Sequence, residues 1–348
     1  MPMQVYHIAP DNRLKPIQGA IQNTPSRTIS ISGSEFFGFS SCKPRYTFRI
    51  RFMTDELTVY NKGDMVEGYR IMSEIGRGAA SIIYLVQDPK SKQIWALKHV
   101  EKTDPKAQRF LDQAAIEYKI ANQINHPAIR RIEKLIKSGS LLKIRDLYLV
   151  MELVDGISLF EEIPDRLDVL VDLFQQTASG LAEMHSNGYV HADMKPHNII
   201  IGSDIDGNLT AKVIDLGQSC KTGTIKKRIQ GTPDYIAPEQ VHRREITPKT
   251  DIYNFGATMY WTLTGKNIPT AMGTKSDSLM GSLDDALIKE ATPISELRSD
   301  LPDRLSDLIM QCCQVDIDAR PASMSGVAKK LDLILGIIRA PSVPVDEV

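Results

Sequence analysis

The sequence predicts an α+β protein built as two unlike lobes, a small strand-rich lobe followed by a larger helical one. Between residues 69 and 153, short apolar segments succeed one another and enclose one helical segment. After Gly156 the apolar residues recur at helical spacing instead. Strands and helices that are segregated along a chain, rather than alternating, favour an α+β architecture over a doubly wound parallel sheet.

Five segments of the first lobe have the short apolar runs that are typical of strands. The first two flank a turn that contains Gly76 and Gly78, which is the pattern of a hairpin. The five expected strands are residues 69–75, 82–87, 93–100, 132–136 and 146–153.

One helix is expected within the first lobe. Asp104 and Pro105 provide an N-cap and a first helical residue, and the helix should run to about Ile124. It should stop before His126, because Pro127 disfavours helical backbone in the residue that precedes it.

The second lobe should be mainly helical. Gly188 is placed to end its first long helix, and residues 268–299 predict short helices in a long connection. The apolar face of that first helix has members three or four residues apart, namely Leu170, Leu173, Phe174, Thr177, Leu181 and Met184.

The two ends of the chain differ from its centre. The first part is rich in Ser, Thr, Asn, Gln, Pro and Gly, and residues 46–52 alternate apolar and charged residues as one strand would. We therefore expect an N-terminal extension over 1–66, partly disordered with one strand, and a C-terminal tail over 338–348. The domain between them should divide into lobes 67–154 and 155–337.

The composition excludes several classes of protein. With 348 residues, of which 42% are hydrophobic, the chain can bury a sizeable core and is not a wholly disordered protein. Its 42 Lys and Arg against 43 Asp and Glu give a net charge of −1, so we expect no nucleic-acid partner. The uncharged stretch 252–265 is too short for a membrane span.

The four cysteines indicate a reducing compartment. Cys42, Cys220, Cys312 and Cys313 form no CxxC pair and no Cys/His spacing of the zinc type. The N-terminus has no apolar segment of the signal-peptide kind. We expect neither a disulfide framework nor a structural zinc, and a cytoplasmic location.

Two features of the first lobe could serve chemistry. The turn from Gly76 to Ser81 could bring backbone N–H groups close to phosphate oxygens, although such a turn alone is more often an ordinary hairpin. Strand alternation places Lys98 on the same face as Ala96, where a lysine is costly unless it is paired. Glu117 on the following helix is the favoured partner, and Asp112 is the alternative.

The strongest signal lies in the second lobe, in the loop from His191 to Asn198. This loop carries an acid, a lysine and an amide within six residues: Asp193, Lys195 and Asn198. Further on, an apolar run ends in Asp215, and an acid at the end of a strand is a natural metal ligand.

Taken together and in this order, these segments resemble the eukaryotic-type (Hanks-type) serine/threonine protein kinases, over about residues 69–335. The resemblance also rests on the runs 231–239, 250–256 and 316–321, and it implies the bilobal protein kinase fold. The run 231–240 is most similar to bacterial members of the family. Lys195 is the residue expected of Ser/Thr-specific members.

The resemblance implies a role for each matching residue. Asp193 would accept the hydrogen bond of the substrate hydroxyl, and Lys195 would neutralise the γ-phosphate. Lys98 would hold the α- and β-phosphates and pair with Glu117. Thr232 would hold Asp193 and Lys195 in place.

The resemblance further implies which residues bind the nucleotide and the metal. Asn198 and Asp215 would bind two Mg²⁺ ions, with Mn²⁺ as an alternative ion. The residues expected to surround ATP are Gly76, Gly78, Ile83, Ala96, Lys98, Met151, Glu152, Val154 and Ile200. Outside the site, Glu239 and Arg320 would form a buried ion pair, and Asp251 would cap the catalytic loop.

One departure from the family pattern concerns regulation. Ala192 stands where most regulated members carry the Arg that gathers a phosphate on the activation loop, which makes this a non-RD variant. A phosphate on Thr222 or Thr224 would therefore lack its main acceptor. The nearby basic residues are Lys221, Lys226, Lys227 and Arg228, which read most simply as a solvated charge run.

The resemblance implies transfer of the γ-phosphoryl group of ATP to Ser and Thr hydroxyls of protein substrates, with autophosphorylation. A pseudokinase scaffold is the alternative, but all four of Lys98, Asp193, Asn198 and Asp215 are present. A small-molecule kinase of related fold is disfavoured, because Thr232 and the run 237–239 belong to a groove for a polypeptide. The expected partners are ATP and a protein substrate.

Overall fold

The computed structural model describes residues 6–8, 14–16, 57–78, 80–140, 143–272 and 288–340, and the chain divides into two compact units, Met1–Thr54 and Asp55–Val348. In the first unit, β1 (Tyr6–Ile8) pairs antiparallel with β2 (Leu14–Pro16). The sequence predicted one strand for this extension, over residues 46–52, and that segment lies outside the described residues.

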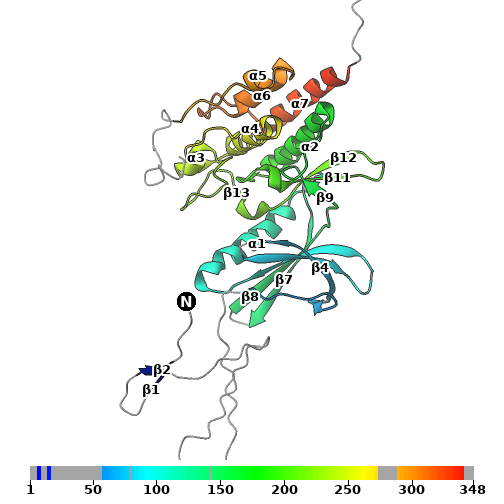
Figure 1. The fold of residues 1–348 in the computed structure, drawn as a ribbon, viewed down its shortest axis with the longest axis vertical. Coiled ribbons are helices and arrows are strands. Elements are labelled where there is room, and N and C mark those ends of the chain that lie inside the picture. The colour runs from blue at the N-terminus through cyan, green and yellow to red at the C-terminus, as the bar shows by residue number, and fades with distance from the viewer. Residues whose placement is uncertain are drawn as a thin grey trace, which may run out of the picture. The chain divides into compact units, whose positions relative to one another are not determined.

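A six-stranded antiparallel sheet forms the small lobe of the second unit, with strand order β3-β4-β5-β6-β8-β7 (Figure 1). Its strands are β3 (Met65–Val66), β4 (Tyr69–Arg77), β5 (Ser81–Gln87), β6 (Ile94–Glu101), β7 (Ile132–Ser140) and β8 (Lys143–Met151). All five expected strands are present. The last two extend toward each other beyond their predicted ends, because their tips pair with each other despite a polar sequence that gives no apolar run.

The register of this sheet aligns residues that the sequence singled out. Gly76 pairs with Ile83, and Ile83 pairs with Lys98 on the next strand. Ala96 pairs with Met151 one strand further along. Residues far apart in the chain therefore form two neighbouring rows across the sheet.

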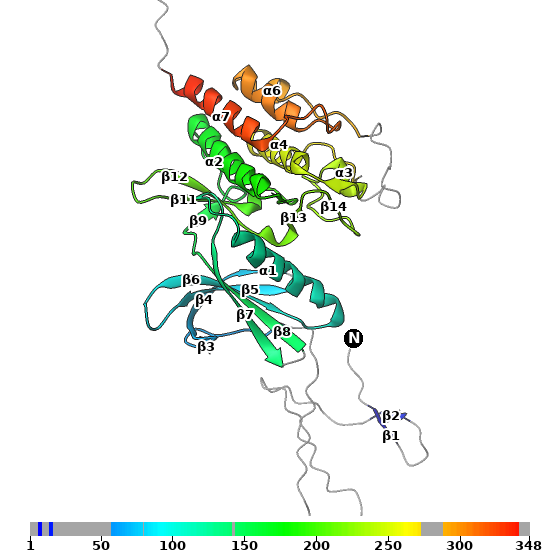
Figure 2. The same ribbon diagram turned by 180° about the vertical axis from the view of Figure 1, so that it is seen from behind.

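A single long helix packs against this sheet (Figure 2). Asp104 accepts a hydrogen bond from the backbone N–H of Ala107 at 2.8 Å, which caps the short 3₁₀ segment η1 (Pro105–Ala107). That segment leads into α1 (Gln108–Ala121). The predicted start is confirmed. The predicted end at Ile124 is three residues too far, because residues 122–124 form a turn instead of a further helical turn.

The larger lobe is mainly helical (Figure 1). Its helices are α2 (Leu167–Ser186), α3 (Pro238–Val241), α4 (Pro248–Thr264), α5 (Ile294–Leu297), α6 (Asp303–Cys312) and α7 (Met324–Arg339). Gly188 follows the end of α2 with a φ of 77°, as its predicted position requires. Among the described residues, no helix combines the length and the apolar character that crossing a bilayer demands.

Helix α4 runs through the centre of this lobe and is buried along most of its length. Its polar residues are compatible with burial because they bond within the helix. The Thr258 hydroxyl donates to the carbonyl of Asn254 at 2.8 Å, and the Thr262 hydroxyl donates to the carbonyl of Thr258 at 2.8 Å. This rigid helix carries Asp251 near its start.

Short strands connect the two lobes and position the loops between them. β9 (Gly156–Ser158), β11 (Ile199–Ser203) and β12 (Leu209–Val213) form a three-stranded sheet with β11 in the middle. A Cβ at Gly156 would lie 2.1 Å from the carbonyl oxygen of Ile201, so only glycine permits this close approach. Two further pairs join β10 (Tyr189–Val190) to β13 (Cys220–Lys221) and β14 (Thr224–Ile225) to β15 (Glu245–Ile246).

Residues 57–61, which we name the N-terminal strap, cover a second apolar core of the sheet. Leu57 and Tyr60 pack against this core, which includes Tyr84 and Tyr148. The Tyr60 and Tyr148 hydroxyls are 2.7 Å apart, and the N–H of Thr58 donates to Glu101 at 2.7 Å. The strap therefore belongs to the same compact unit as the sheet.

Candidate active site

The small-lobe part of the site is a buried charged group centred on Lys98. Its ammonium lies 2.7 Å from a carboxylate oxygen of Glu117 on α1 and 3.6 Å from Asp215. The Glu117 side chain is 1% exposed, and Arg130 lies 3.5 Å from its other oxygen. Of the two acids that the sequence offered to Lys98, Glu117 makes the contact, whereas Asp112 is exposed and accepts from Gln108.

The charges of this group reinforce one another. Burial alone would lower the pKa of Lys98, but the nearby Glu117 and Asp215 carboxylates outweigh it and raise the pKa above its ordinary value. The positive charge of Lys98 is in turn the main reason why the pKa of Asp215 lies below its ordinary value. Lys98 is therefore cationic and Asp215 anionic at neutral pH.

The large-lobe part of the site is the loop between β10 and β11. Lys195 donates to one oxygen of Asp193 at 2.9 Å, and the Thr232 hydroxyl donates to the other at 2.8 Å. Lys195 also donates to the Thr232 hydroxyl at 2.9 Å, so the three side chains close a ring. Both oxygens of Asp193 are thereby held in a fixed orientation.

Asp251 of α4 holds the backbone of this loop in place. Its two oxygens accept the N–H groups of His191 and Ala192, each at 2.7 Å, and one of them also lies 2.8 Å from His185. Burial opposes the ionisation of Asp251, but its hydrogen bonds to His185 and the loop prevail and lower its pKa. A left-handed φ of 61° at Ala192 is maintained by these bonds.

The hairpin of β11 and β12 brings Asn198 next to Asp215. Ile199 pairs with Val213, and the N–H of Ile214 donates to the carbonyl of Asn198 at 2.9 Å. Asn198 donates its amide N–H to the carbonyl of Asp193 at 2.8 Å, so its oxygen remains available. Carboxylate and amide oxygens are the donors that Mg²⁺ prefers, so the chemistry of these two residues fits a divalent cation.

The expected nucleotide pocket lies at the edge of the sheet. Met151 is fully buried, and Ala96 is 4% exposed, whereas Ile83 and Ile200 are half-buried. Just beyond Met151, the N–H and carbonyl of Val154 are bonded to no other described residue. A purine needs such unpaired backbone groups beside an apolar surface.

Glu152 can offer one of its two backbone groups. Its N–H already donates to the carbonyl of Arg131 at 3.0 Å, so only its carbonyl remains for a nucleotide. Its side chain forms an ion pair with Lys212 at 2.8 Å. The opposite wall is the turn between β4 and β5, where the N–H of Gly78 donates to the carbonyl of Ser81 at 2.8 Å and Gly76 contacts Ile83 across the pair.

Away from these groups, a buried ion pair joins α3 to the segment before α7. Arg320 donates to both oxygens of Glu239, at 2.8 and 3.0 Å, and both side chains are almost fully buried. Arg320 also donates to the carbonyls of Gln314, Val315 and Lys249. The pair has the structural geometry that the sequence implied and no contact with Asp193.

Two contacts of the activation segment were not predicted. Lys226 is half-buried and donates to the backbone carbonyl of Gln218, and burial lowers its pKa. The reading of Lys226 as part of a solvated charge run is therefore wrong for this residue, although Lys227 and Arg228 are exposed. Nothing in a run of basic residues distinguishes the one that folds inward.

The second contact is made by Gln240. Its amide donates to the carbonyl of Ala192 at 2.8 Å and to the carbonyl of Gln230 at 3.1 Å. One neutral side chain thus ties the catalytic loop to the activation segment.

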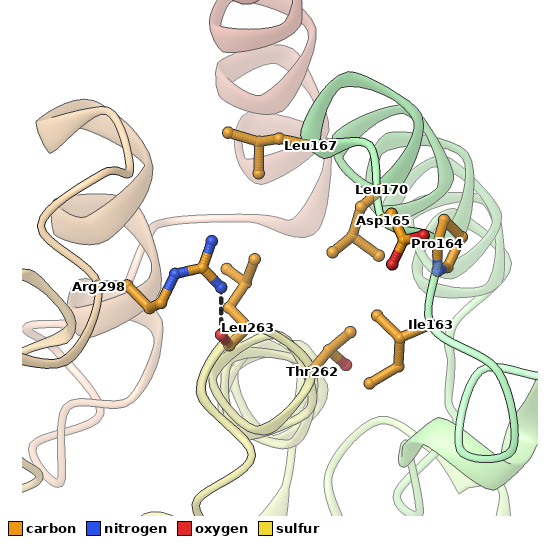
Figure 3. Close-up of a pocket in the computed structure, with 8 residues that line it drawn as sticks. All are labelled: Ile163, Pro164, Asp165, Leu167, Leu170, Thr262, Leu263 and Arg298. Atoms are coloured by element: carbon orange, nitrogen blue, oxygen red, sulfur yellow. Dashed lines mark hydrogen bonds between the residues drawn. The ribbon is translucent and has the colours of Figure 1, made fainter.

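A cavity of about 230 Å³ lies elsewhere in the large lobe, between α2, α4 and the segment before α6 (Figure 3). Arg298 donates to the carbonyl of Leu263 at its edge, at 2.9 Å. The lining residues include none of the predicted site residues; they are Ile163, Pro164, Asp165, Leu167, Leu170, Thr262, Leu263 and Arg298.

Taken together, the site presents a fixed carboxylate, two cations and two oxygen donors for a metal. Asp193 can orient and deprotonate a hydroxyl, while Lys98 and Lys195 can neutralise negative charge on a transferring group. Asn198 and Asp215 can hold a divalent cation. The arrangement suits the transfer of an anionic group from a nucleotide to an alcohol.

Comparisons with known proteins agree with this chemistry. Residues 69–331 match the family described as the protein kinase domain. A probable serine/threonine-protein kinase of Clostridium acetobutylicum is 29% identical over 250 residues, which are 71% of this chain and 36% of the relative. A probable myosin light chain kinase of Dictyostelium discoideum is 32% identical over 210 residues, 57% of this chain and 63% of the relative.

A third relative, like the first, comes from a bacterium. The serine/threonine-protein kinase PrkC of Bacillus subtilis is 32% identical over 213 residues, which are 59% of this chain and 32% of the relative. The chain thus spans between about a third and about two thirds of the length of these relatives.

Proposed function

Because the chain belongs to the protein kinase family, we propose that it transfers the γ-phosphoryl group of ATP to Ser and Thr hydroxyls of protein substrates, itself included. The observation that carries this proposal is the closed ring of Asp193, Lys195 and Thr232. A carboxylate held at both oxygens beside a cation is organised for catalysis. A protein that had lost catalysis would have no need for this ring.

In this proposal Asp193 orients the substrate hydroxyl and accepts its proton late in the reaction. The transition state of phosphoryl transfer is loose, so the hydroxyl becomes acidic only as its oxygen bonds to phosphorus. Thr232 and Lys195 keep the carboxylate in one orientation. Lys195 also neutralises charge that develops on the transferring phosphoryl group.

On the other side of the site, Lys98 binds the nucleotide phosphates and Glu117 keeps its ammonium in position. The turn with Gly76 and Gly78 covers the phosphates. Val154 offers both backbone groups to the adenine and Glu152 its carbonyl, between Ala96, Met151, Ile83 and Ile200.

Asn198 and Asp215 would hold Mg²⁺, with Mn²⁺ as the alternative ion, and the fit rests on their oxygen donors at the joined ends of β11 and β12. When bound, the metal neutralises phosphate charge and orients the phosphates. Lys98 keeps Asp215 ionised and therefore able to bind a cation.

We place the protein in the cytoplasm. The support is its cysteines, since Cys220, Cys312 and Cys313 are free thiols and Cys312 and Cys313 are buried. The expected partners are ATP and a protein substrate.

The proposal is tested by incubating the chain with ATP labelled at the γ-phosphate. We expect label on the protein or on an added generic basic protein. In Asp193→Asn, transfer should fall by at least about a hundredfold, because a positioned general base contributes roughly 10²–10⁴. Asp215→Asn should also abolish transfer.

A matched control is Asp206→Asn, which makes the same chemical change at an exposed loop position. It should transfer label like the wild type. Equal activity of Asp193→Asn and Asp206→Asn, with both folded by circular dichroism, would refute the proposal.

A further inference from the structure

Gln240, on the short helix α3, uses every hydrogen-bonding position of its side-chain amide. The residue is 3% exposed. Its amide nitrogen donates to the carbonyls of Ala192 and Gln230, at 2.8 and 3.1 Å. Its oxygen accepts from the N–H of Ala237 at 3.0 Å and from the amide of Asn254 at 2.9 Å. Two donors and two acceptor sites are all that such an amide has, so the group is fully satisfied.

The surroundings of this amide permit only one orientation. Ala192 and Gln230 present carbonyl oxygens, which can only accept, whereas Ala237 presents an N–H, which can only donate. Exchanging the nitrogen and oxygen of Gln240 would set an oxygen against two carbonyl oxygens and a nitrogen against an N–H. The side chain is therefore fixed between the catalytic loop, the activation segment and the start of α3.

One of the two carbonyls belongs to Ala192, the residue just before the catalytic carboxylate of Asp193. The N–H of Ala192 donates to Asp251 at 2.7 Å, and its carbonyl accepts from Gln240. Both of these partners are tied to α4, because Asp251 and Asn254 lie on that helix and Asn254 donates to Gln240. Ala192 has the left-handed φ of 61°, which a residue with a side chain adopts only where its surroundings enforce it. The backbone position of Asp193 thus depends on Gln240 as well as on Asp251.

The other carbonyl lies just before the residue that orients the Asp193 side chain. Gln230 stands two residues before Thr232, whose hydroxyl donates to Asp193 at 2.8 Å. Gly231 lies between them with a φ of 132°, and a Cβ there would lie only 3.1 Å from the amide nitrogen of Gln240. The chain therefore has a glycine where the activation segment passes the Gln240 amide.

We propose that Gln240 is a positioning residue for phosphoryl transfer, which keeps Asp193 and Thr232 in their relative positions without touching the substrate. The inference rests on the proposed kinase activity and assigns part of its machinery to a residue outside the catalytic loop. Misplacing a reacting group by about 1 Å can cost roughly a hundredfold in rate. A buried side chain that holds both segments can therefore control kcat from a distance.

The variant Gln240→Met tests this proposal. Methionine has nearly the same length and volume as glutamine but cannot donate to the two carbonyls. In the labelling of a Ser peptide, kcat should fall roughly ten- to a hundredfold. The KM for ATP should change by no more than about twofold, because the hydrogen bonds of Gln240 involve none of the residues proposed to bind the nucleotide. An unchanged kcat would overturn the inference, whatever the KM.

The matched control is Gln176→Met on α2. The amide of Gln176 also joins two segments through backbone groups, since it donates to the carbonyl of Leu209 at 3.3 Å and accepts from the N–H of Ala211 at 2.9 Å. This variant should lose stability in urea denaturation and keep the wild-type kcat. If the two variants lowered kcat alike, lost stability rather than lost positioning would be the cause, and the inference would be wrong.

A milder variant covers the case in which Gln240→Met does not fold, as judged by circular dichroism. Gln240→Asn keeps the amide but shortens its reach by one methylene, so it cannot span both carbonyls. It should lower kcat at an unchanged KM for ATP, in the same direction as Gln240→Met. A folded Gln240→Asn with the wild-type kcat would count against the proposal.

A double-variant cycle with Thr232→Val identifies the group through which Gln240 acts. Both side chains are proposed to act on the orientation of Asp193, so the loss of kcat in the double variant should be smaller than the product of the two single losses. Losses that multiply would place the effect of Gln240 elsewhere and refute its assigned role.

Hydrogen exchange follows the same contacts without catalysis. The N–H of Ala192 donates to Asp251, so its exchange rate reports how firmly the loop is held. Exchange at this N–H should become faster in Gln240→Met, whereas Gln176→Met should affect Ala211 instead. If the wild type labels neither a peptide nor itself, the kinase activity fails, but exchange at Ala192 still decides whether Gln240 holds the loop. If the wild type is active and Gln240→Met matches it in both kcat and exchange, the activity stands and the positioning role is refuted.

Discussion

The two halves of the active site are held by different kinds of contact. In the small lobe, the half-buried Lys98 and the buried Glu117 meet side chain to side chain, with the more exposed Asp215 as a third charge. In the large lobe, Asp251 binds the loop backbone directly, and both of its oxygens are completely buried. Two side chains that contact each other can change rotamer, whereas a carboxylate bonded to buried backbone N–H groups is tied to the path of the chain itself.

This difference separates activity from stability. The large-lobe half is organised before any ligand arrives, so loss of the buried groups that hold its backbone, such as Asp251, should destabilise the protein. The small-lobe half can lose a side chain and remain folded, so damage there should appear in catalysis.

The largest effect on stability is expected for Arg320→Leu. It leaves the buried Glu239 carboxylate without its partner and frees three carbonyls, and breaking such a pair costs roughly 3–5 kcal/mol. Urea denaturation measures the loss. Arg304→Leu, at an exposed position of α6, is the control and should change little.

A double variant checks the cause. Arg320→Leu/Glu239→Leu removes both charges and should recover part of the stability. If Arg320→Leu alone left the denaturation midpoint unchanged, the large lobe would not depend on its buried charges and the contrast would disappear.

Next comes Lys98→Met in the small lobe. Phosphoryl transfer should fall by about a hundredfold or more, because a positioned cation in an active site is worth roughly 10²–10³. The free energy of unfolding should fall by only about 1–2 kcal/mol, since Glu117 keeps Arg130 within 3.5 Å. Lys90→Met, at an exposed turn, is the control for both measurements. A stability loss as large as that of Arg320→Leu would show that the Lys98 group holds the fold together as firmly as the buried groups of the large lobe do.

A smaller effect should follow pH. The pKa of Asp251 in the folded protein lies below its ordinary value of 3.8, so its ionised form stabilises the fold. That stability is present above about pH 4 and is lost as the pH falls through the lower folded-state pKa. Urea midpoints measured from pH 7 downward should fall more steeply for the wild type than for Asp251→Asn. Parallel curves would contradict this assignment.

The smallest effect is expected for Thr222→Ala/Thr224→Ala. Gln240 and Lys226 already tie the activation segment without a phosphate, and Ala192 offers no acceptor for one. Kinase activity should therefore stay within a few-fold of wild type at unchanged stability. A loss of a hundredfold or more would show that loop phosphorylation organises the large-lobe half after all.

The sequence predicted most of the fold because its elements have local signals. Strand runs, the Asp104 cap and Gly188 each mark a boundary within a few residues. The predicted ends of strands were wrong where pairing with another strand, rather than the local sequence, determined them. The tips of β7 and β8 are strands because they pair with each other, and no periodicity in either reveals that.

The same distinction applies to the site. Lys98, Asp193, Asn198 and Asp215 could be named because they occur in runs that resemble a known family. The inward orientation of Lys226 could not be predicted, because Lys226 lies in the same basic run as its exposed neighbours. Phe160 stacks with His197 and with Trp261, which lie 37 and 101 positions further along the chain, so only the tertiary structure brings these three rings together.

The N-terminal strap determines where a shortened recombinant fragment of this protein can begin. A recombinant fragment starting at residue 67 would look complete by its strand pattern, yet it would uncover Tyr84 and Tyr148 and leave Glu101 without the Thr58 donor. Aromatic surface exposed in this way promotes aggregation during purification. Fragments should keep the ten residues before Glu67, Leu57 through Val66, if they are to stay in solution.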